Sequence, residues 1–290
     1  MSLYPSIYEA KEQILDIGRR MYLKGFVAAN DGNISCRISQ DTILTTPTGV
    51  SKGFMDGDML VKMTLDGKVL SDGPYKPSSE VKMHIRAYKE NPEIMAVTHA
   101  HPPVATSFAI AGIGLDQPIL TEAIMALGSV PVAKYATPGT DEVPDSIAPF
   151  CKEYNSVLMA NHGALSWGSS LMQAYYRLES VEYFATIMMY TGNIIGKSNK
   201  LSCEQIAPLL EVRAKLGIKG GGVPSCAIQT TNDKDVMPAS GPIGGGCMCG
   251  GDKTKTVYGG SAAAPESNVN ANELDELVER VTREILNRIK

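Results

Sequence analysis

The stretch Ile94-Met-Ala-Val-Thr-His-Ala-His101 decides the fold. Residues 94–98 form a short apolar run that is typical of a buried strand, and this strand delivers His99 at its end. Side chains alternate with a period of two along a strand, so His99 and His101 are expected on the same face. The sequence therefore predicts a pair of imidazoles at the end of a buried strand.

The segments around this strand read as hairpins and helices. An amphipathic helix is expected over residues 7–24, and another over 80–90 with Ser78 as its N-cap. Strand pairs are expected for 34–38 with 42–46 and for 59–63 with 68–70. The remaining expected elements are a helix over 104–110, strands over 130–135 and 156–159, and helices over 171–191 and 203–216. This mixture predicts an α/β or α+β fold in which helices flank a central, largely antiparallel sheet.

A change in composition divides the chain into three parts. Residues 1–218 have the patterns of a folded domain, whereas 219–265 contain 11 of the chain's 28 glycines and predict a flexible linker. Residues 266–290 predict a short amphipathic helix, with Asn272 as a plausible N-cap and an apolar stripe that begins at Leu274.

Composition and charge narrow the class of protein. The chain is 43% hydrophobic and 20% charged, as expected for a globular protein. Its net charge of −4 argues against nucleic acid as the main partner. The N-terminus shows no basic region followed by an apolar stretch. No apolar run approaches the length of roughly 20 residues that a membrane span needs. A cytoplasmic location is therefore expected.

A third histidine extends the pair at the end of the strand. His162 in Asn161-His-Gly163 follows an apolar run, so it also lies at a strand end. Three neutral imidazoles with an open fourth position describe a catalytic zinc site rather than a structural one. Two histidines in an HxH pattern also occur by chance, and a lone histidine is usually a satisfied core or surface residue. Spacing alone leaves both interpretations open.

Glu80 is the candidate acid or base beside this site. It stands in Lys76-Pro-Ser-Ser-Glu80, where a loop enters a helix, and a carboxylate there is suited to move a proton next to a metal. The alternative is that Glu80 merely favours the helix N-terminus through the helix dipole. His84, one helical turn further on, is interpreted as structural.

Three short segments have the hydroxyls, amides and turn N–H groups that bind phosphate. They are Gly32-Asn33, Thr48-Gly49 and Ser78-Ser79. Each segment alone is weak evidence for a phosphate site, because the same residues populate ordinary turns.

Together these segments resemble the class II aldolase/adducin-head family. The resemblance covers roughly residues 7–216, and its motifs follow the family order. They are Gly32-Asn-Ile-Ser35, Thr46-Pro-Thr-Gly49, Pro77-Ser-Ser-Glu80, His99-Ala-His-Pro102, Tyr135-Ala-Thr-Pro-Gly-Thr140 and Asn161-His-Gly163.

The resemblance implies a role for each candidate residue. His99, His101 and His162 would bind one zinc ion per subunit, and Glu80 would be the catalytic acid/base. The substrate phosphate would be held by Asn33, Thr48, Gly49, Ser78 and Ser79. The implied reaction is cleavage of a deoxy-ketose 1-phosphate, such as L-fuculose 1-phosphate or L-rhamnulose 1-phosphate, to dihydroxyacetone phosphate and lactaldehyde. The implied assembly is a C4 homotetramer with active sites at the subunit interfaces.

The sequence departs in two places from the pattern of the aldolases in this family. Glu122 stands near the position where the aldolase has a tyrosine proton donor from the neighbouring subunit. The C-terminal tail, which carries another tyrosine in the aldolase, gives way here to the glycine-rich linker.

A linker that ends in a short amphipathic helix resembles the encapsulation peptides of bacterial microcompartment enzymes, which dock on shell or cargo proteins. An oligomerisation helix, or a helix packed on the same domain, is the alternative.

Other activities of the same family stay open at this point. An L-ribulose-5-phosphate 4-epimerase would share the metal site and the retro-aldol step, and a sugar-phosphate dehydratase is a further candidate. A non-enzymatic, adducin-like scaffold is also conceivable, but scaffolds of that kind lose the metal ligands, whereas this chain retains the three histidines and Glu80.

Overall fold

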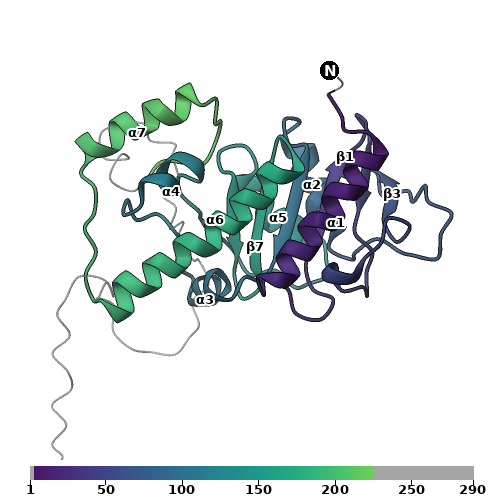
Figure 1. Cartoon of the computed structure of the whole chain (residues 1–290), viewed down its shortest axis with the longest axis horizontal. Coiled ribbons are helices and arrows are strands. Elements are labelled where there is room, and N and C mark those ends of the chain that lie inside the picture. The colour runs from purple at the N-terminus through teal and green to yellow at the C-terminus, as the bar shows by residue number, and fades with distance from the viewer. Residues whose placement is uncertain (1–2, 225–290) are drawn as a thin grey trace, which may run out of the picture. The chain divides into compact units, whose positions relative to one another are not determined.

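A seven-stranded sheet forms the centre of the protein in the computed structural model, which describes residues 3–224 (Figure 1). The strand order is β3-β2-β1-β4-β7-β6-β5, and every neighbouring pair is antiparallel except β5 with β6. The strands are β1 (Asn33–Arg37), β2 (Thr42–Thr45), β3 (Val61–Thr64), β4 (Ala96–Ala100), β5 (Val132–Ala133), β6 (Ser156–Met159) and β7 (Gly163–Gly168). The prediction of a largely antiparallel sheet flanked by helices is confirmed.

Helices cover the two faces of this sheet. The α-helices are α1 (Ile7–Leu23), α2 (Val81–Glu90), α3 (Pro103–Ala111), α4 (Thr121–Ala126), α5 (Glu142–Ile147), α6 (Leu171–Met189) and α7 (Cys203–Lys215). Two short 3₁₀ turns, η1 (Lys52–Phe54) and η2 (Ala148–Phe150), and a π-helical turn, η3 (Tyr190–Ile194), complete the described elements. In Figure 1, α1 and α6 lie across the front of the sheet, and α2 and α5 lie behind it.

The buried apolar residues separate into two clusters, one on each face of the sheet. Ala10, Ile14, Ile17 and Met21 of α1 pack with residues of α6 in one cluster. They recur with helical spacing, and a capping box between Ser6 and Glu9 fixes the start of α1. The second cluster joins α2 and α5 to the opposite face and includes Trp167. The protein is therefore a three-layer arrangement with the sheet in the middle.

Strand β4 shows how the sheet orients His99. Thr98 faces α6, because its Oγ1 donates a hydrogen bond to the carbonyl of Ala174. Val97, one residue earlier, packs in the cluster on the α2 side. By the alternation of a strand, His99 points to the same side as Val97. The helix that begins next to Glu80 covers that side, so sheet geometry brings Glu80 and His99 together.

Some of the expectations differ from the structure. Strand β7 was not expected, because all six of its residues are buried and a strand buried on both faces lacks alternation. The short helices α4 and α5 were also missed. Ser78 is not the N-cap of α2: the helix begins at Val81 with Glu80 at the cap position, and Ser78 Oγ accepts a hydrogen bond from the Glu80 N–H.

The expected linker starts inside the described part of the chain. The N–H groups of Gly221 and Gly222 both donate to the carbonyl of Glu153, and the carbonyl of Gly221 accepts from the Ser129 N–H. Residues 219–224 are therefore hydrogen-bonded to the domain. The rest of the expected linker and the C-terminal amphipathic helix lie outside the described residues. Among residues 3–224, no helix is both long and apolar enough to cross a membrane.

Candidate active site

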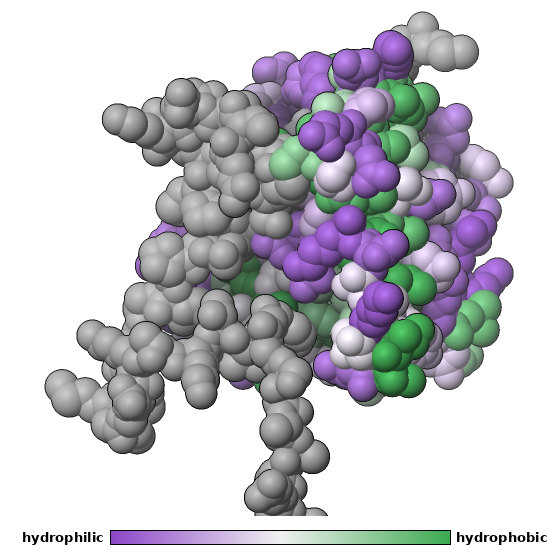
Figure 2. Space-filling model, turned by 90° about the vertical axis from the view of Figure 1, so that its left-hand side faces the viewer, coloured by the Kyte–Doolittle hydropathy of each residue, from purple (hydrophilic) through white to green (hydrophobic). Residues whose placement is uncertain are grey.

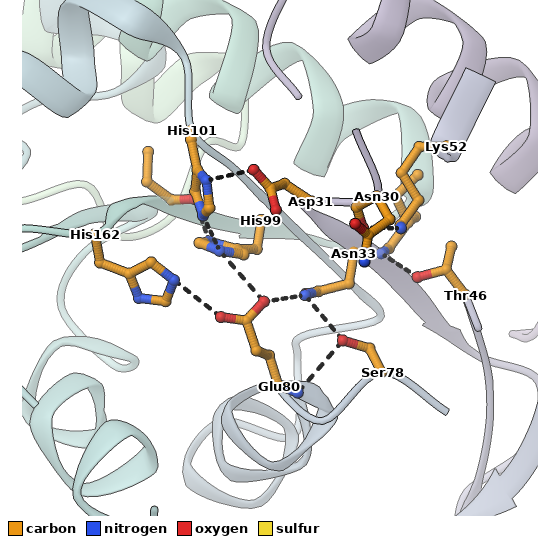
Figure 3. A network of polar contacts seen from close by, with 12 residues as sticks. Asn30, Asp31, Asn33, Thr46, Lys52, Ser78, Glu80, His99, His101 and His162 are labelled. Carbon is orange, nitrogen blue, oxygen red and sulfur yellow. Dashed lines mark hydrogen bonds and ion pairs between the residues drawn. The ribbon is translucent and has the colours of Figure 1, made fainter. Parts of the chain in front are cut away.

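Three histidines converge at the ends of interior strands of the sheet (Figure 3). His99 belongs to β4, His101 follows it by two residues, and His162 lies in the turn between β6 and β7. One nitrogen from each ring lies within 4.8 Å of the others. The structure thus brings together the three residues that were predicted from the sequence as metal ligands.

The surroundings of the rings suit a divalent metal. His99 Nδ1 lies 2.9 Å from the carbonyl oxygen of Ala164, so this nitrogen carries the proton and donates it. His99 Nε2 is then left with a lone pair and lies 3.2 Å from His101 Nε2. A backbone acceptor behind a ligating imidazole is the usual means of fixing its tautomer at metal sites. His101 Nδ1 lies 3.5 Å from a carboxylate oxygen of Asp31, which orients the second ring.

His99 and His101 are poised to be neutral. Burial lowers the pKa of His99 to about 3, more strongly than the nearby carboxylate of Glu80 raises it. Burial and then the neighbouring His162 lower the pKa of His101. Only a neutral imidazole offers a lone pair to a metal, so the donor set fits zinc or another divalent ion that accepts nitrogen ligands.

Glu80 lies against this cluster from the start of α2. One carboxylate oxygen is 2.9 Å from His162 Nε2, and the other is 3.6 Å from His99 Nε2. The second oxygen also accepts a hydrogen bond of 2.7 Å from Asn33 Nδ2. Burial on its own would raise the pKa of this carboxyl, but the imidazoles of His99 and His162 hold it well below its usual range. Glu80 is therefore an ionised carboxylate beside the three histidines.

A cavity of about 210 Å³ opens next to Glu80 and His101. Of the residues expected to bind phosphate, Thr48, Ser78 and Ser79 line it. Asn33 stands behind the cavity, where its Nδ2 also donates to Ser78 Oγ at 3.3 Å. Gly49 is not among the lining residues. Its φ is positive, at 73°, in a region that glycine adopts most readily.

The cavity also contains residues that were not predicted from the sequence. Asn30, Asp31 and Lys52 line it, together with Pro138 and Gly139 from one of the family motifs. Asp31 stands in the same turn as Asn33, and this position was a usable signal that Asp31 belongs to the site. Lys52 had none, because a single lysine in a turn is ordinarily solvated.

Two further residues lie outside the cluster. His84 is fully buried, and its Nδ1 lies 2.7 Å from Ser35 Oγ, as expected for a structural histidine. Glu122 is exposed in the first turn of α4, where its carboxylate accepts a hydrogen bond from Thr121 Oγ1. Its suggested role depends on a neighbouring subunit, so it stays a prediction.

The turn that carries His162 is tightly constrained. Asn161 has a positive φ of 57°, a left-handed conformation that asparagine tolerates better than most residues. Gly163 has no room for a side chain, because a Cβ there would lie 2.5 Å from the Ala100 carbonyl oxygen and 2.6 Å from His101 Cδ2. Backbone geometry on both sides of His162 thus explains the motif Asn161-His-Gly163.

A larger cavity, of about 260 Å³, lies at the other end of β7 beside Asn155, Trp167 and Arg177. None of the candidate metal, acid/base or phosphate residues lines it, so the candidate site lies at the smaller cavity.

Comparison with known proteins agrees with this geometry. The sequence profile of the "Class II Aldolase and Adducin N-terminal domain" matches residues 12–189. The chain is 31% identical to 3-oxo-tetronate 4-phosphate decarboxylase of Pectobacterium atrosepticum over 205 residues, which covers 69% of this chain and 92% of that protein. It is 32% identical to L-fuculose phosphate aldolase of Escherichia coli K12 over 209 residues, which covers 71% of this chain and 95% of that protein.

A solved structure extends the likeness to three dimensions. A structure of L-fuculose 1-phosphate aldolase superposes with a TM-score of 0.66 at 29% identity, covering 71% of this chain and 99% of that one. The profile spans more than half of the chain, and these relatives include an aldolase and a decarboxylase. The chain therefore belongs to the class II aldolase and adducin N-terminal domain family, and within it the chain is a metal-dependent lyase.

Proposed function

We propose that the protein breaks the bond between the α carbon and the next carbon along from the carbonyl of a phosphorylated keto compound, leaving the enediolate of dihydroxyacetone phosphate. The position of Glu80 carries this proposal. Its carboxylate lies between the three-histidine cluster and a cavity lined by the hydroxyls of Thr48, Ser78 and Ser79. A proton-transfer group, a cation site and a phosphate cradle thus meet within one small volume.

The histidines fit a zinc ion, because one nitrogen from each ring lies within 4.8 Å of the others and the tautomer of His99 is fixed by Ala164. Zinc held there would supply Lewis-acid stabilisation of the negative charge that develops on the substrate oxygens.

The protein's own residues account for the rest of the reaction. Thr48, Ser78 and Ser79 would hold the phosphate and so fix which carbon faces Glu80. In the condensation direction the ionised Glu80 would remove a proton from the hydroxymethyl carbon of dihydroxyacetone phosphate. In the cleavage direction the same carboxyl returns that proton to carbon, after the electrons of the broken bond have moved into the enediolate. Asn33 holds the carboxylate through a 2.7 Å hydrogen bond.

The first candidate substrate is a deoxy-ketose 1-phosphate, L-fuculose 1-phosphate or L-rhamnulose 1-phosphate. Cleavage of its C3–C4 bond requires loss of the proton from the C4 hydroxyl, which becomes the carbonyl of lactaldehyde. Glu122 of a neighbouring subunit is our candidate for the group that takes this proton, and it requires the homotetrameric arrangement implied by the family resemblance. The similarity to L-fuculose phosphate aldolase supports this reaction.

The second candidate is decarboxylation of a 3-oxo acid phosphate, which the similarity to 3-oxo-tetronate 4-phosphate decarboxylase favours. Loss of CO₂ from that compound leaves the same enediolate, and no hydroxyl has to lose a proton. The two reactions therefore use the described site in the same way and differ only in the leaving group.

The step common to both candidates can be tested without a sugar. Dihydroxyacetone phosphate incubated in D₂O with zinc-loaded protein should exchange one hydroxymethyl hydrogen, which proton NMR follows directly. No exchange above that of chelator-treated protein would sink the proposal. Supplying L-fuculose 1-phosphate, L-rhamnulose 1-phosphate and 3-oxo-tetronate 4-phosphate separately, and measuring dihydroxyacetone phosphate, then identifies the leaving group. L-Ribulose 5-phosphate in the same series tests for the 4-epimerase.

We also propose that the C-terminal segment directs the enzyme to a bacterial microcompartment, in keeping with the amphipathic pattern of residues 266–290. A fluorescent protein fused to these residues should collect at shells in cells that make them. Diffuse fluorescence in such cells would argue for one of the other roles of an amphipathic helix.

A further inference from the structure

Lys52 is an unusual lysine. It begins the turn η1, only 1% of its surface is exposed, and it lines the cavity that Thr48, Ser78 and Ser79 also line. Within residues 3–224, it is the one lysine or arginine among the lining residues of that cavity. Lysine is rarely buried to this degree unless its charge has a partner.

The hydrogen bonds of Lys52 leave its charge unmatched. The ammonium donates to the carbonyl oxygens of Asn30 and Val50, both at 2.7 Å. These are neutral acceptors, and no carboxylate of the described chain lies within ion-pair distance of Lys52. An ammonium has three N–H donors, so one donor is left over after the two carbonyls. A buried cation with a spare donor, at the wall of a cavity, is a ready partner for an anion.

The fold also holds this ammonium in a fixed place. The Lys52 carbonyl packs so closely on α1 that a Cβ at Gly18 would lie 2.5 Å from its oxygen. The two acceptors belong to the turns before β1 and after β2, so the ammonium ties these turns together (Figure 3). A lysine held in this way loses little side-chain freedom when a ligand binds, unlike a surface lysine.

The protonated form of Lys52 is less favoured in the free protein than that of a lysine in water. Burial lowers the pKa of Lys52 to about 8, while the carboxylates of Asp31 and Glu80 oppose the shift. A phosphate in the cavity would add a nearby negative charge and favour the protonated amine.

We propose that Lys52 selects a phosphorylated substrate, its third N–H donating to the phosphate that the hydroxyls of Thr48, Ser78 and Ser79 hold. The hydroxyls provide shape and hydrogen bonds, and Lys52 provides the charge. This proposal relies on the proposed function only for the position of the phosphate, not for the bond that is broken.

The competing explanation is that Lys52 only ties the two turns together. Lys52→Gln separates the two roles, because a glutamine amide keeps two N–H donors for the carbonyls but has no charge. Lys52→Arg keeps the charge, and Lys68→Met, in the exposed hairpin after β3, is the control for loss of a lysine elsewhere. Lys52→Met removes the charge together with both donors, so it replaces the glutamine variant only as a folded variant without the charge, and an unchanged exchange of dihydroxyacetone then shows that the site is intact.

Two measurements decide between the roles. The first is the dissociation constant of inorganic phosphate, measured by calorimetry on zinc-loaded protein. A hydrogen bond to a charged group contributes enough that Lys52→Gln should weaken phosphate binding roughly 10- to 150-fold, with Lys68→Met unchanged and Lys52→Arg in between. The second is hydrogen exchange in D₂O with dihydroxyacetone, which has no phosphate. Lys52→Gln should leave this rate unchanged, while exchange of dihydroxyacetone phosphate falls with the phosphate affinity.

The outcomes are distinct. Unchanged phosphate binding in Lys52→Gln, or an equal fall in exchange of both compounds, would overturn the proposal in favour of a structural tie. If the wild-type protein binds phosphate through Lys52 but exchanges neither compound, the role of Lys52 stands and the proposed lyase reaction fails.

Discussion

Replacement of Glu80 by glutamine tests the centre of the mechanism. The two side chains have the same shape, so glutamine can still accept the 2.7 Å hydrogen bond from Asn33 Nδ2. It cannot take a proton from carbon. Loss of a positioned acid/base group typically lowers a rate ~10²- to 10⁴-fold, which corresponds to about 3–5 kcal/mol of barrier. We expect Glu80→Gln to lose that much in the exchange of dihydroxyacetone phosphate in D₂O.

If Glu80 only stabilises its helix, the same substitution lowers the stability slightly and leaves the exchange rate unchanged. A carboxylate at a helix N-terminus contributes about 0.3–1 kcal/mol to stability, and a folded protein with that loss would keep its full rate. Glu204→Gln, in the exposed first turn of α7, is the matched control and should leave exchange unchanged. Zinc content must be measured alongside, because His162 and His99 contact the carboxylate. Exchange within tenfold of wild type at full zinc occupancy would refute the assignment of Glu80.

Gly163→Ala forces a methyl group against Ala100 and His101. Zinc affinity should therefore fall ~10- to 100-fold in chelator competition, whereas Gly73→Ala, where the space is open, should not change it. Removing the metal with a chelator should abolish exchange and lower the melting temperature by roughly 5–10 °C, reversibly on adding zinc, and an unchanged temperature would contradict a bound ion. Burial lowers the pKa of His84 from 6.5 to about 3, so the unfolded chain binds the extra proton in that pH range and stability is lost as the pH falls through it. His84→Asn should flatten this dependence by up to about 1.4 kcal/mol per pH unit in urea titrations, and an equal slope in both proteins would contradict it.

The sequence predicted the parts of the site that depend on local patterns. His99 and His101 follow from the two-residue period of a strand, and the position of Glu80 follows from a loop that enters a helix. The helix α1 could be predicted because its apolar residues recur at helical spacing and its N-terminus has a capping box. In each case the information lies within a few residues of the feature.

The features that were missed depend on contacts between distant segments. Strand β7 is buried on both faces, so its sequence has no alternation, and only its pairing with β4 and β6 defines it. Lys52 looks like a surface residue until α1 packs against its turn at Gly18. The Asp31 carboxylate contacts His101 from a turn far away in the sequence. The position of Asp31 in the turn beside Asn33 marks it as a candidate, but no local pattern indicates this contact.

The left-handed backbone at Asn161 gives the site an adjustable element. A residue with a branched Cβ costs roughly 1–2 kcal/mol in that conformation, and only a shift of this otherwise tightly constrained turn would relieve the strain. The imidazole of His162 is attached to the same turn and would rotate with it. A saturation library at residue 161 would therefore re-aim the imidazole of His162 without replacing any of the three candidate ligands. Screening such a library against cobalt, manganese and nickel would let protein engineers alter the metal preference without substituting any of the three histidines.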